Sequence, residues 1–275
     1  MTTDTTDPSV TLRPEILAYY ARGEEQGRLH RSHNRLELWR TRDVLRRLLG
    51  PGPLRILDVG GGAGIHAEWL AADGHEVDLV DPVPLHVEQA GALPGVRAVL
   101  GDARALPVED GGHDAVLMLG PLYHLPERAD RIRSLAEARR AVRPGGLVVA
   151  ATINRFAGLH DQLRVERYFE PGPREVTDAC VVSGTLAHSP DSPLFTTAYF
   201  HRAGDVPGEF ADAGLDVTGQ YGLEGAAWLM GPVEEWLDDP ERRGTVLAAL
   251  RSAESEPSLL GVSGHLLTAG RAPMG

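Results

Sequence analysis

The first residues that could carry chemistry form a glycine-rich turn with an acid just before it. Asp58 precedes Gly60, Gly62 and Gly64 at the end of an apolar stretch. These glycines let the backbone turn sharply and approach a ligand with no Cβ in the way. Asp81 ends the next apolar stretch, about 20 residues after Gly60, where an acid accepts hydrogen bonds from ribose hydroxyls. The pair indicates a site for a cofactor that contains a nucleoside.

The spacing of the glycines distinguishes two kinds of nucleoside cofactor. A dinucleotide site prefers the pattern G-x-G-x-x-G. Counted from Gly60, the third glycine would fall on Ile65, and counted from Gly62 it would fall on Ala67. Neither frame fits, so a nicotinamide-dependent oxidoreductase is the weaker alternative.

The spacing that does fit, D-x-G-x-G-x-G, resembles the motif of the class I methyltransferases that use S-adenosylmethionine (SAM). Two further segments agree in the matching order, Gly101-Asp102-Ala103 after the third apolar stretch and Arg143-Pro144-Gly145-Gly146 before the fifth. The resemblance covers about residues 54–152. It implies a Rossmann-like α/β fold with a doubly wound sheet of about seven strands. It also implies SAM as cosubstrate and S-adenosylhomocysteine as product.

The resemblance assigns cofactor contacts to individual positions of this chain. Asp58 would support the methionine end of SAM, and the glycine turn would pack against it. Asp81, followed by Pro82, would hold the ribose hydroxyls, while Asp102 and the Ala103 backbone would hold adenine. The alternative for Asp81 and Asp102 is a cap or turn residue of an ordinary α/β protein.

A candidate acceptor segment, Gly-Pro-Leu-Tyr-His at residues 120–124, follows the fourth apolar stretch. Ligands in open α/β sheets lie beyond the carboxyl ends of the strands. Methyl transfer from a sulfonium is a direct displacement, and a base helps when the acceptor carries a proton. His124 is the first candidate for that base, and Tyr123 is a second candidate as orienter or lid. Alternatively, Tyr123 packs and His124 bonds a backbone carbonyl.

The same segment bears on the class of acceptor. Gly120 lacks the side-chain oxygen that the D/N-P-P-Y signature of adenine methylation provides, and no Pro-Cys pair for cytosine chemistry exists. The net charge of −12 also disfavours a nucleic-acid partner. We therefore expect a small organic acceptor, such as an aromatic or heteroaromatic natural product of secondary metabolism. Methylation at O, N or C stays open, as do a macromolecular acceptor and a SAM-binding protein without catalysis.

Residues outside the predicted core could complete the pocket. The segment 19–25 is similar to the lid helix of small-molecule methyltransferases, and Tyr20 could touch the sulfonium or the substrate through its ring. Arg28 could bond the methionine carboxylate. Glu224, near Trp228, could act as a base or anchor a cation. Simple packing or a solvated charge is the alternative for each of them.

The elements that must position these residues follow from short apolar runs that alternate with helical stretches after residue 54. The alternation predicts parallel βαβ units with right-handed crossovers. The strands are almost continuously apolar, as expected for a parallel sheet covered on both faces. Strands are predicted at 55–59, 76–80, 96–100, 114–119, 147–151, 216–221 and 265–270, with helices near 14–22, 32–49, 65–73, 85–90, 128–142, 206–213 and from 233 to about 252, interrupted at 239–240.

Four regions follow from this pattern. Residues 1–53 are expected to form a helical lid, and 54–153 the SAM-binding core. Residues 154–203 contain several prolines and no clear strand pattern, so they are expected to be an insertion that caps the substrate. Residues 204–275 would complete the sheet. Three residues near the end of the insertion could line an aromatic site, namely Phe195, Tyr199 and His201.

The composition excludes several kinds of chemistry. All 27 basic residues are Arg, which rules out a lysine Schiff base or general base. The single cysteine, Cys180, allows no internal disulfide and is expected to be a buried or bystander thiol. The 11 His are scattered without a metal-ligand spacing, so no metal site is predicted.

The hydropathy pattern and the N-terminus bear on location. No apolar run reaches the ~18–20 residues that span a bilayer. The first nine residues are polar and hold two Asp and no basic residue, unlike a secretory or transit peptide. We therefore expect a cytoplasmic protein with no membrane partner. The oligomeric state is not predicted, because no heptad pattern marks an interface.

Overall fold

A sheet of seven strands organises the computed structural model, which describes residues 13–20, 27, 29, 34–187 and 196–274. In sheet order, the strands are β3 (Val96–Leu100), β2 (Glu76–Asp81), β1 (Arg55–Val59), β4 (His113–Met118), β5 (Val142–Ile153), β9 (His265–Arg271) and β8 (Asp216–Gly222). The strands from β3 to β5 run parallel, whereas β9 is antiparallel to both β5 and β8. The predicted doubly wound α/β fold is confirmed, and the strand order reverses between β1 and β4.

The strands are buried on both faces of the sheet. Ile56 and Leu117 pack in the apolar cluster of one face, and Leu57 and Val116 pack in the cluster of the other. Successive side chains of a strand point to opposite faces, so a strand covered on both sides must be apolar at nearly every position. This requirement explains why the strands were readable as continuous apolar runs.

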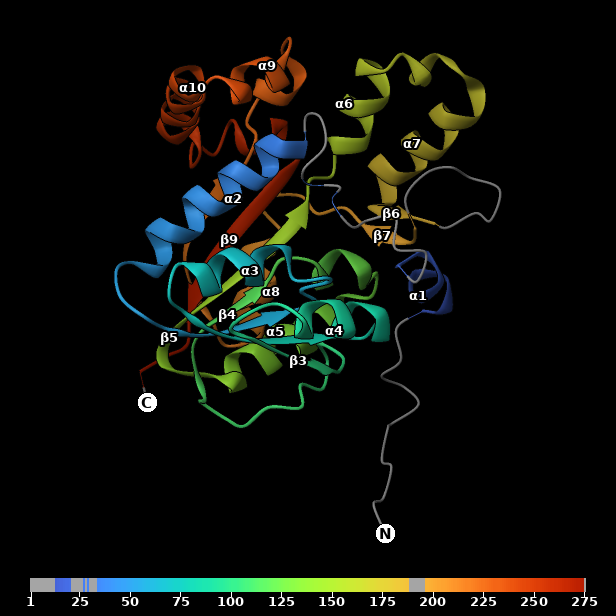
Figure 1. The fold of residues 1–275 in the computed structure, drawn as a ribbon. Helices are drawn as coiled ribbons and strands as arrows, with labels where there is room; N and C mark the ends of the chain where they lie inside the picture. Colours follow the sequence, from blue (N-terminus) through green and yellow to red (C-terminus); the bar gives the residue numbers. More distant parts are fainter. Residues whose placement is uncertain (1–12, 21–26, 28, 30–33, 188–195, 275) are drawn as a thin grey trace.

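Two helical layers cover the sheet. Helices α2 (Asn34–Leu49), α3 (Ile65–Ala72) and α4 (Pro84–Gly91) contribute to the first cluster. Helices α5 (Arg128–Ala141) and α8 (Val206–Asp212) contribute to the second. Figure 1 shows α2 beside α3, with α9 (Val233–Asp238) and α10 (Pro240–Ala253) above.

The predicted interruption between α9 and α10 is confirmed. The Asp239 side chain accepts hydrogen bonds from the backbone N–H groups of Glu241 and Arg242, and Pro240 occupies the first turn of α10. An acid at the N-cap followed by proline is a strong helix start. A new helix therefore begins where the apolar pattern by itself would have continued.

The segment after β5 contains regular structure that the sequence pattern did not predict. It holds α6 (Ala157–Arg164), the 3₁₀ turn η4 (Arg167–Phe169), α7 (Pro171–Ser183) and the short ladder of β6 (Thr185–Leu186) with β7 (Ala198–Tyr199). The prolines at 171 and 173 begin α7 instead of breaking it, because a first helical turn tolerates proline.

This segment has a small apolar core of its own. Ile153, Ala157, Cys180, Leu186, Ala198 and Phe200 are its buried members. Burial raises the pKa of the Cys180 thiol to about 11, so the thiol stays protonated and unreactive at neutral pH. The expectation that Cys180 is buried is confirmed.

The two N-terminal helices have different roles. Helix α2 packs in the main core through Val44 and Leu45. Helix α1 (Pro14–Tyr20) lies near β6 and β7 (Figure 1), where Ile16 is fully buried and Thr197 Oγ1 donates a hydrogen bond to Glu15 at 3.2 Å. The lid role of residues 1–53 stays a prediction. Among the described residues it applies to α1, because α2 is part of the main core.

The remaining described elements are short. They are the 3₁₀ turns η3 (Pro121–His124), η5 (Ala227–Leu229) and η6 (Leu260–Val262). Among the described helices, none combines the length and the apolarity that crossing a bilayer requires. Of the residues singled out above, Arg28 and Phe195 lie outside the part of the chain that the structure describes.

Candidate active site

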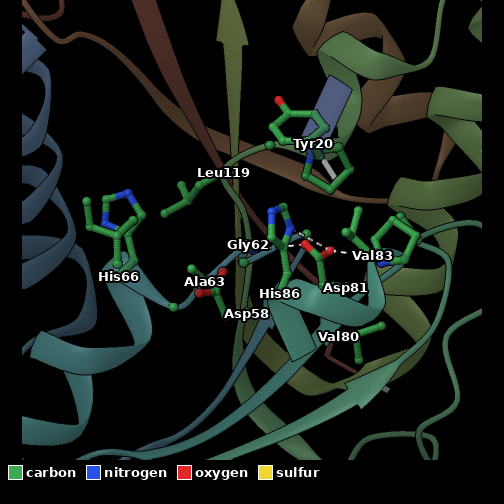
Figure 2. Close-up of a pocket in the computed structure, with 18 of the residues that line it drawn as sticks. Tyr20, Asp58, Gly62, Ala63, His66, Val80, Asp81, Val83, His86 and Leu119 are labelled. Carbon is green, nitrogen blue, oxygen red and sulfur yellow. Dashed lines mark hydrogen bonds and ion pairs between the residues drawn. The ribbon is translucent and has the colours of Figure 1, made fainter. Parts of the chain in front are cut away.

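A cavity of about 470 Å³ opens at the carboxyl ends of β1, β2 and β4. This is the point where the strand order reverses, which is where open α/β sheets bind ligands. Figure 2 shows side chains from the glycine turn, the end of β2 and helix α1 around it. Every described residue of the predicted cofactor set lines the cavity, namely Tyr20, Asp58, Gly60, Gly62, Gly64, Asp81, Pro82, Asp102 and Ala103.

The glycine turn has a backbone that requires glycine. Gly60, Gly62 and Gly64 have φ angles of 66°, 57° and 89°, in the left-handed region that side chains disfavour. A Cβ on Gly60 would lie 2.8 Å from the Pro121 ring, and one on Gly61 would lie 2.6 Å from Asp58 Oδ2. The turn therefore keeps the strand end, the start of α3 and the segment after β4 in close approach.

Asp58 is the most unusual titratable group in the cavity. Its side chain is 1% exposed, and neither carboxyl oxygen has a hydrogen-bond partner among the described residues. Burial, and secondarily the nearby charge of Asp81, raise the pKa of Asp58 to about 7. A buried carboxyl without a donor is suited to a cationic group of a ligand, and the ammonium of the SAM methionine end is such a group.

Asp81 is held rigidly at the end of β2. Its carboxylate accepts hydrogen bonds from the backbone N–H of Gly62 at 2.9 Å and of Val83 at 2.9 Å, and it contacts His86 Nδ1 at 3.0 Å. Oδ1 has two of these contacts and Oδ2 has one, while each carboxylate oxygen can accept two hydrogen bonds. Oδ2 therefore retains capacity for one further donor, such as a ribose hydroxyl. His86 lines the cavity too, and no sequence signal pointed to it.

Asp102 lines the cavity but is already engaged. Arg104 donates to its carboxylate through the backbone N–H at 2.8 Å, Nε at 2.9 Å and Nη2 at 2.9 Å. Arg104 also pairs with Asp130 at 2.9 Å. The role of Asp102 toward adenine stays a prediction, and any adenine amine would share this carboxylate with Arg104. The sequence analysis did not anticipate that pairing.

Tyr20 and His124 meet although 103 residues separate them in the chain. Tyr20 Oη lies 2.6 Å from His124 Nε2, and His124 Nδ1 lies 3.4 Å from the Thr197 carbonyl oxygen. The arrangement suits an imidazole that donates from Nδ1 to the carbonyl and accepts the Tyr20 hydroxyl proton at Nε2. Burial lowers the pKa of His124 to about 4, so the ring is neutral at neutral pH.

Aromatic rings surround that pair. The Tyr20 ring meets the His124 and His86 rings edge to face, at centroid distances of 5.2 and 5.6 Å. The Tyr123 ring lies 4.7 Å from that of His124, and its hydroxyl donates to the Leu119 carbonyl at 3.4 Å. His124 thus faces a backbone carbonyl and also contacts the hydroxyl of Tyr20, which lines the cavity. Its role as a base stays a prediction.

Glu224 lies outside the lining of the cavity, so it is not positioned to act as a base there. It is 4% exposed and absent from the cavity lining, and its carboxylate accepts from Ser263 Oγ at 2.8 Å and from the His265 backbone N–H at 2.9 Å. Its Oε1 also lies 2.6 Å from His265 Nδ1. The geometry therefore gives Glu224 no direct contact with a ligand of the cavity. Its predicted neighbour Trp228 is packed and donates to the Val262 carbonyl at 3.0 Å.

The two described aromatic candidates of the insertion serve packing. The Tyr199 ring stacks under the Arg131 guanidinium at 3.9 Å, and Arg131 forms a buried ion pair with Glu209 at 2.7 Å. His201 is fully buried beside Glu209. Neither Tyr199 nor His201 lines the cavity, so this network joins the insertion to α5 and α8.

Comparison with known proteins identifies a methyltransferase domain within the chain. Residues 56–146 match the family described as "Methyltransferase domain". The chain is 41% identical over 107 residues to the ubiquinone biosynthesis O-methyltransferase of Methylocella silvestris, covering 37% of this chain and 41% of that protein. It is 36% identical over 128 residues to the ubiquinone/menaquinone biosynthesis C-methyltransferase UbiE of Acidiphilium cryptum, covering 43% and 49%. The matched part thus spans less than half of either relative.

Solved structures extend the likeness from the matched segment to nearly the whole fold. The PH0226 protein of Pyrococcus horikoshii superposes with a TM-score of 0.60 at 15% identity, over 93% of this chain and 98% of that one. At this identity the superposition shows the fold alone. Residues 56–146 thus match a methyltransferase domain, and the sheet around them has the strand order of the class I methyltransferase fold.

Proposed function

We propose that this chain transfers the methyl group of SAM to a small organic acceptor, of an aromatic or heteroaromatic kind, by direct displacement. The observation that carries the proposal is Asp58, a buried carboxyl without a donor among the described residues, in a cavity that the predicted cofactor residues line. Such a group is costly for the folded chain on its own and becomes favourable when a cation binds beside it.

The residues of the cavity fit SAM group by group. Asp58 would pair with the methionine ammonium, and the left-handed glycines would let the backbone approach that end of the molecule. Asp81 would accept one ribose hydroxyl at Oδ2, and Asp102 with Ala103 would border the adenine. When bound, SAM supplies a methyl group on a sulfonium, which is electrophilic.

Tyr20 and His124 would handle the acceptor proton. Tyr20 donates its hydroxyl proton toward His124 Nε2, and a hydroxyl oxygen is also able to accept a hydrogen bond from an O–H or N–H of the acceptor. As the acceptor loses its proton to Tyr20, the Tyr20 proton can move to His124. The low pKa of His124 makes it a weak base, so this relay helps most when the new bond is already forming.

The apolar part of the cavity lining supports a small acceptor over a polymer. Leu119, Pro121 and Tyr123 add apolar surface beside the glycine turn, a lining typical of small-molecule sites. One relative named above methylates at oxygen and the other at carbon, so the atom that receives the methyl group remains open. A place in secondary metabolism is part of the same proposal.

A label-transfer experiment tests the proposal. The protein is incubated with methyl-labelled SAM and an extract of its source organism, and label is counted in the organic-soluble and macromolecular fractions. We expect protein-dependent label in the organic-soluble fraction, and its loss with the Asp58→Asn variant. Label found only in protein or nucleic acid would show that the acceptor is a macromolecule and would contradict the small-molecule proposal. If the protein binds S-adenosylhomocysteine but transfers no label, it is a SAM-binding protein without catalytic activity.

A further inference from the structure

A second group of chemically capable side chains lies beside the cavity, outside the residues assigned to SAM. Glu37 of α2, Glu224 after β8 and His265 at the start of β9 converge, with one ligand atom of each within 4.8 Å of the others. His265 Nδ1 lies 2.6 Å from Glu224 Oε1 and 3.8 Å from Glu37 Oε2. Three distant parts of the chain thus present two carboxylates and an imidazole to one point.

The topology explains why this cluster lies at the ligand edge of the sheet. β9 is antiparallel to β5, so its first residue, His265, lies where the parallel strands end. β8 is antiparallel to β9, so Glu224 follows β8 at the same edge. Glu37 belongs to the lining of the cavity. The cluster therefore borders the cavity through Glu37 without using any residue of the glycine turn.

The Glu224 side chain is oriented as metal-binding carboxylates usually are. Its Oε2 is fixed by the Ser263 hydroxyl at 2.8 Å and by the His265 backbone N–H at 2.9 Å, which turns Oε1 toward His265 and Glu37. Such outer hydrogen bonds hold ligating carboxylates in place. Glu224 is deeply buried, while the Glu37 and His265 side chains are 13% and 23% exposed, which leaves a path for an ion.

The charge and the types of these three groups favour a particular class of ligand. The three ligand atoms lie close enough together to contact one ion, and a divalent cation can bind all of them at once. An imidazole nitrogen with two carboxylate oxygens suits first-row transition ions, whereas Mg²⁺ and Ca²⁺ prefer oxygen ligands throughout.

We propose that Glu37, Glu224 and His265 bind a divalent transition-metal ion of the Mn²⁺ to Zn²⁺ series beside the cavity. The sequence analysis predicted no metal site, because positions 37, 224 and 265 form no spacing motif. The ligands become neighbours only through the antiparallel strand β9 and the packing of α2 on the sheet. An ion bound here would adjoin the cavity at Glu37 and could bind an oxygen atom of an acceptor.

Calorimetry with Zn²⁺ on the chelator-treated full chain, without SAM, tests this site. We expect saturable binding of one equivalent, weakened at least tenfold in Glu37→Gln and in His265→Gln. The matched control is Glu68→Gln, which removes an exposed acid of the same cavity outside the cluster and should leave Zn²⁺ binding unchanged. Absence of saturable binding, or equal binding by wild type and Glu37→Gln, would overturn the proposal.

A spectroscopic measurement keeps the test decisive if one variant folds poorly. Co²⁺ added to the wild-type chain should give visible absorption bands of a protein-bound ion with a nitrogen ligand, and excess Zn²⁺ should remove them. A spectrum identical to that of Co²⁺ in buffer would contradict the site. Because neither measurement uses SAM or turnover, the metal site and the proposed methyl transfer succeed or fail independently.

Discussion

The two sides of the cavity are built in different ways. The cofactor side is made of neighbouring loops, since Asp58 and the glycine turn follow β1 and Asp81 ends the adjacent β2. The acceptor side joins Tyr20 of α1, His124 of η3 and the Thr197 carbonyl, which come from widely separated parts of the chain. Backbone geometry defines the first side, whereas the packing of α1 and the position of Thr197 define the second.

The two sides also hold their titratable groups in opposite ways. Burial keeps Asp58 protonated toward neutral pH and keeps His124 unprotonated well into the acidic range. Both groups therefore avoid charge in the cavity before a ligand arrives. The difference lies in their partners. A bound cation would stabilise the ionised Asp58 carboxylate, whereas His124 already has the Tyr20 hydroxyl as a partner.

The largest predicted effect is a pair of opposing pH dependences of stability. The raised pKa of Asp58 lowers the free energy of unfolding as pH rises from about 4 to about 7, by up to about 4 kcal/mol. The lowered pKa of His124 lowers it as pH falls from about 6.5 to about 4, by up to about 3 kcal/mol. In wild type the two slopes largely cancel.

Single variants should separate these slopes. Relative to wild type, Asp58→Asn should gain stability as pH rises from about 4 to about 7, and His124→Ala should gain it as pH falls from about 6.5 to about 4. Urea unfolding at a series of pH values, without SAM, measures both differences. Parallel stability profiles for wild type and both variants would show that neither group is perturbed in the folded chain.

Asp81→Ala should act on the cofactor side alone. Loss of the carboxylate removes the predicted bond to the ribose and leaves the Gly62 and Val83 N–H groups without their acceptor. We expect SAM affinity to fall at least about tenfold, or ~1.4 kcal/mol, measured by calorimetry. Unchanged SAM affinity would show that Asp81 does not contribute to cofactor binding.

His124→Ala should act on the acceptor side alone. Turnover should fall about tenfold, because a positioned proton acceptor is lost, while SAM affinity stays intact. The matched control is His75→Ala, at the opposite edge of the sheet, where His75 Nδ1 accepts the Leu54 N–H. Steady-state rates with calorimetry on the same samples check both variants. If His124→Ala weakens SAM binding as much as turnover, the two sides are not separable.

Tyr20→Phe should give the smallest effect of the series. It keeps the ring against His86 and His124 but removes the hydroxyl that contacts His124 Nε2. We expect a several-fold loss of turnover with no change in SAM affinity, from the loss of about one hydrogen bond. A rate equal to wild type would mean that Tyr20 serves only as an aromatic wall.

Local backbone and burial rules made most of the fold predictable. The strands of the sheet and the glycine turn were readable because continuous apolar runs and left-handed glycines are requirements of single segments. Helices α6 and α7 were not predicted. For α7 the reason is that prolines that begin a helix look the same in sequence as prolines that break one.

The sequence by itself determined the segment that matches a methyltransferase domain, the sheet and the positions of Asp58 and Asp81, since each depends on a short run of residues and its turn. Only the tertiary structure decided the partners of the other candidates. It pairs Tyr20 with His124 and Glu224 with His265. Side-chain contacts between distant segments depend on how helices and strands pack, and no local spacing encodes that packing.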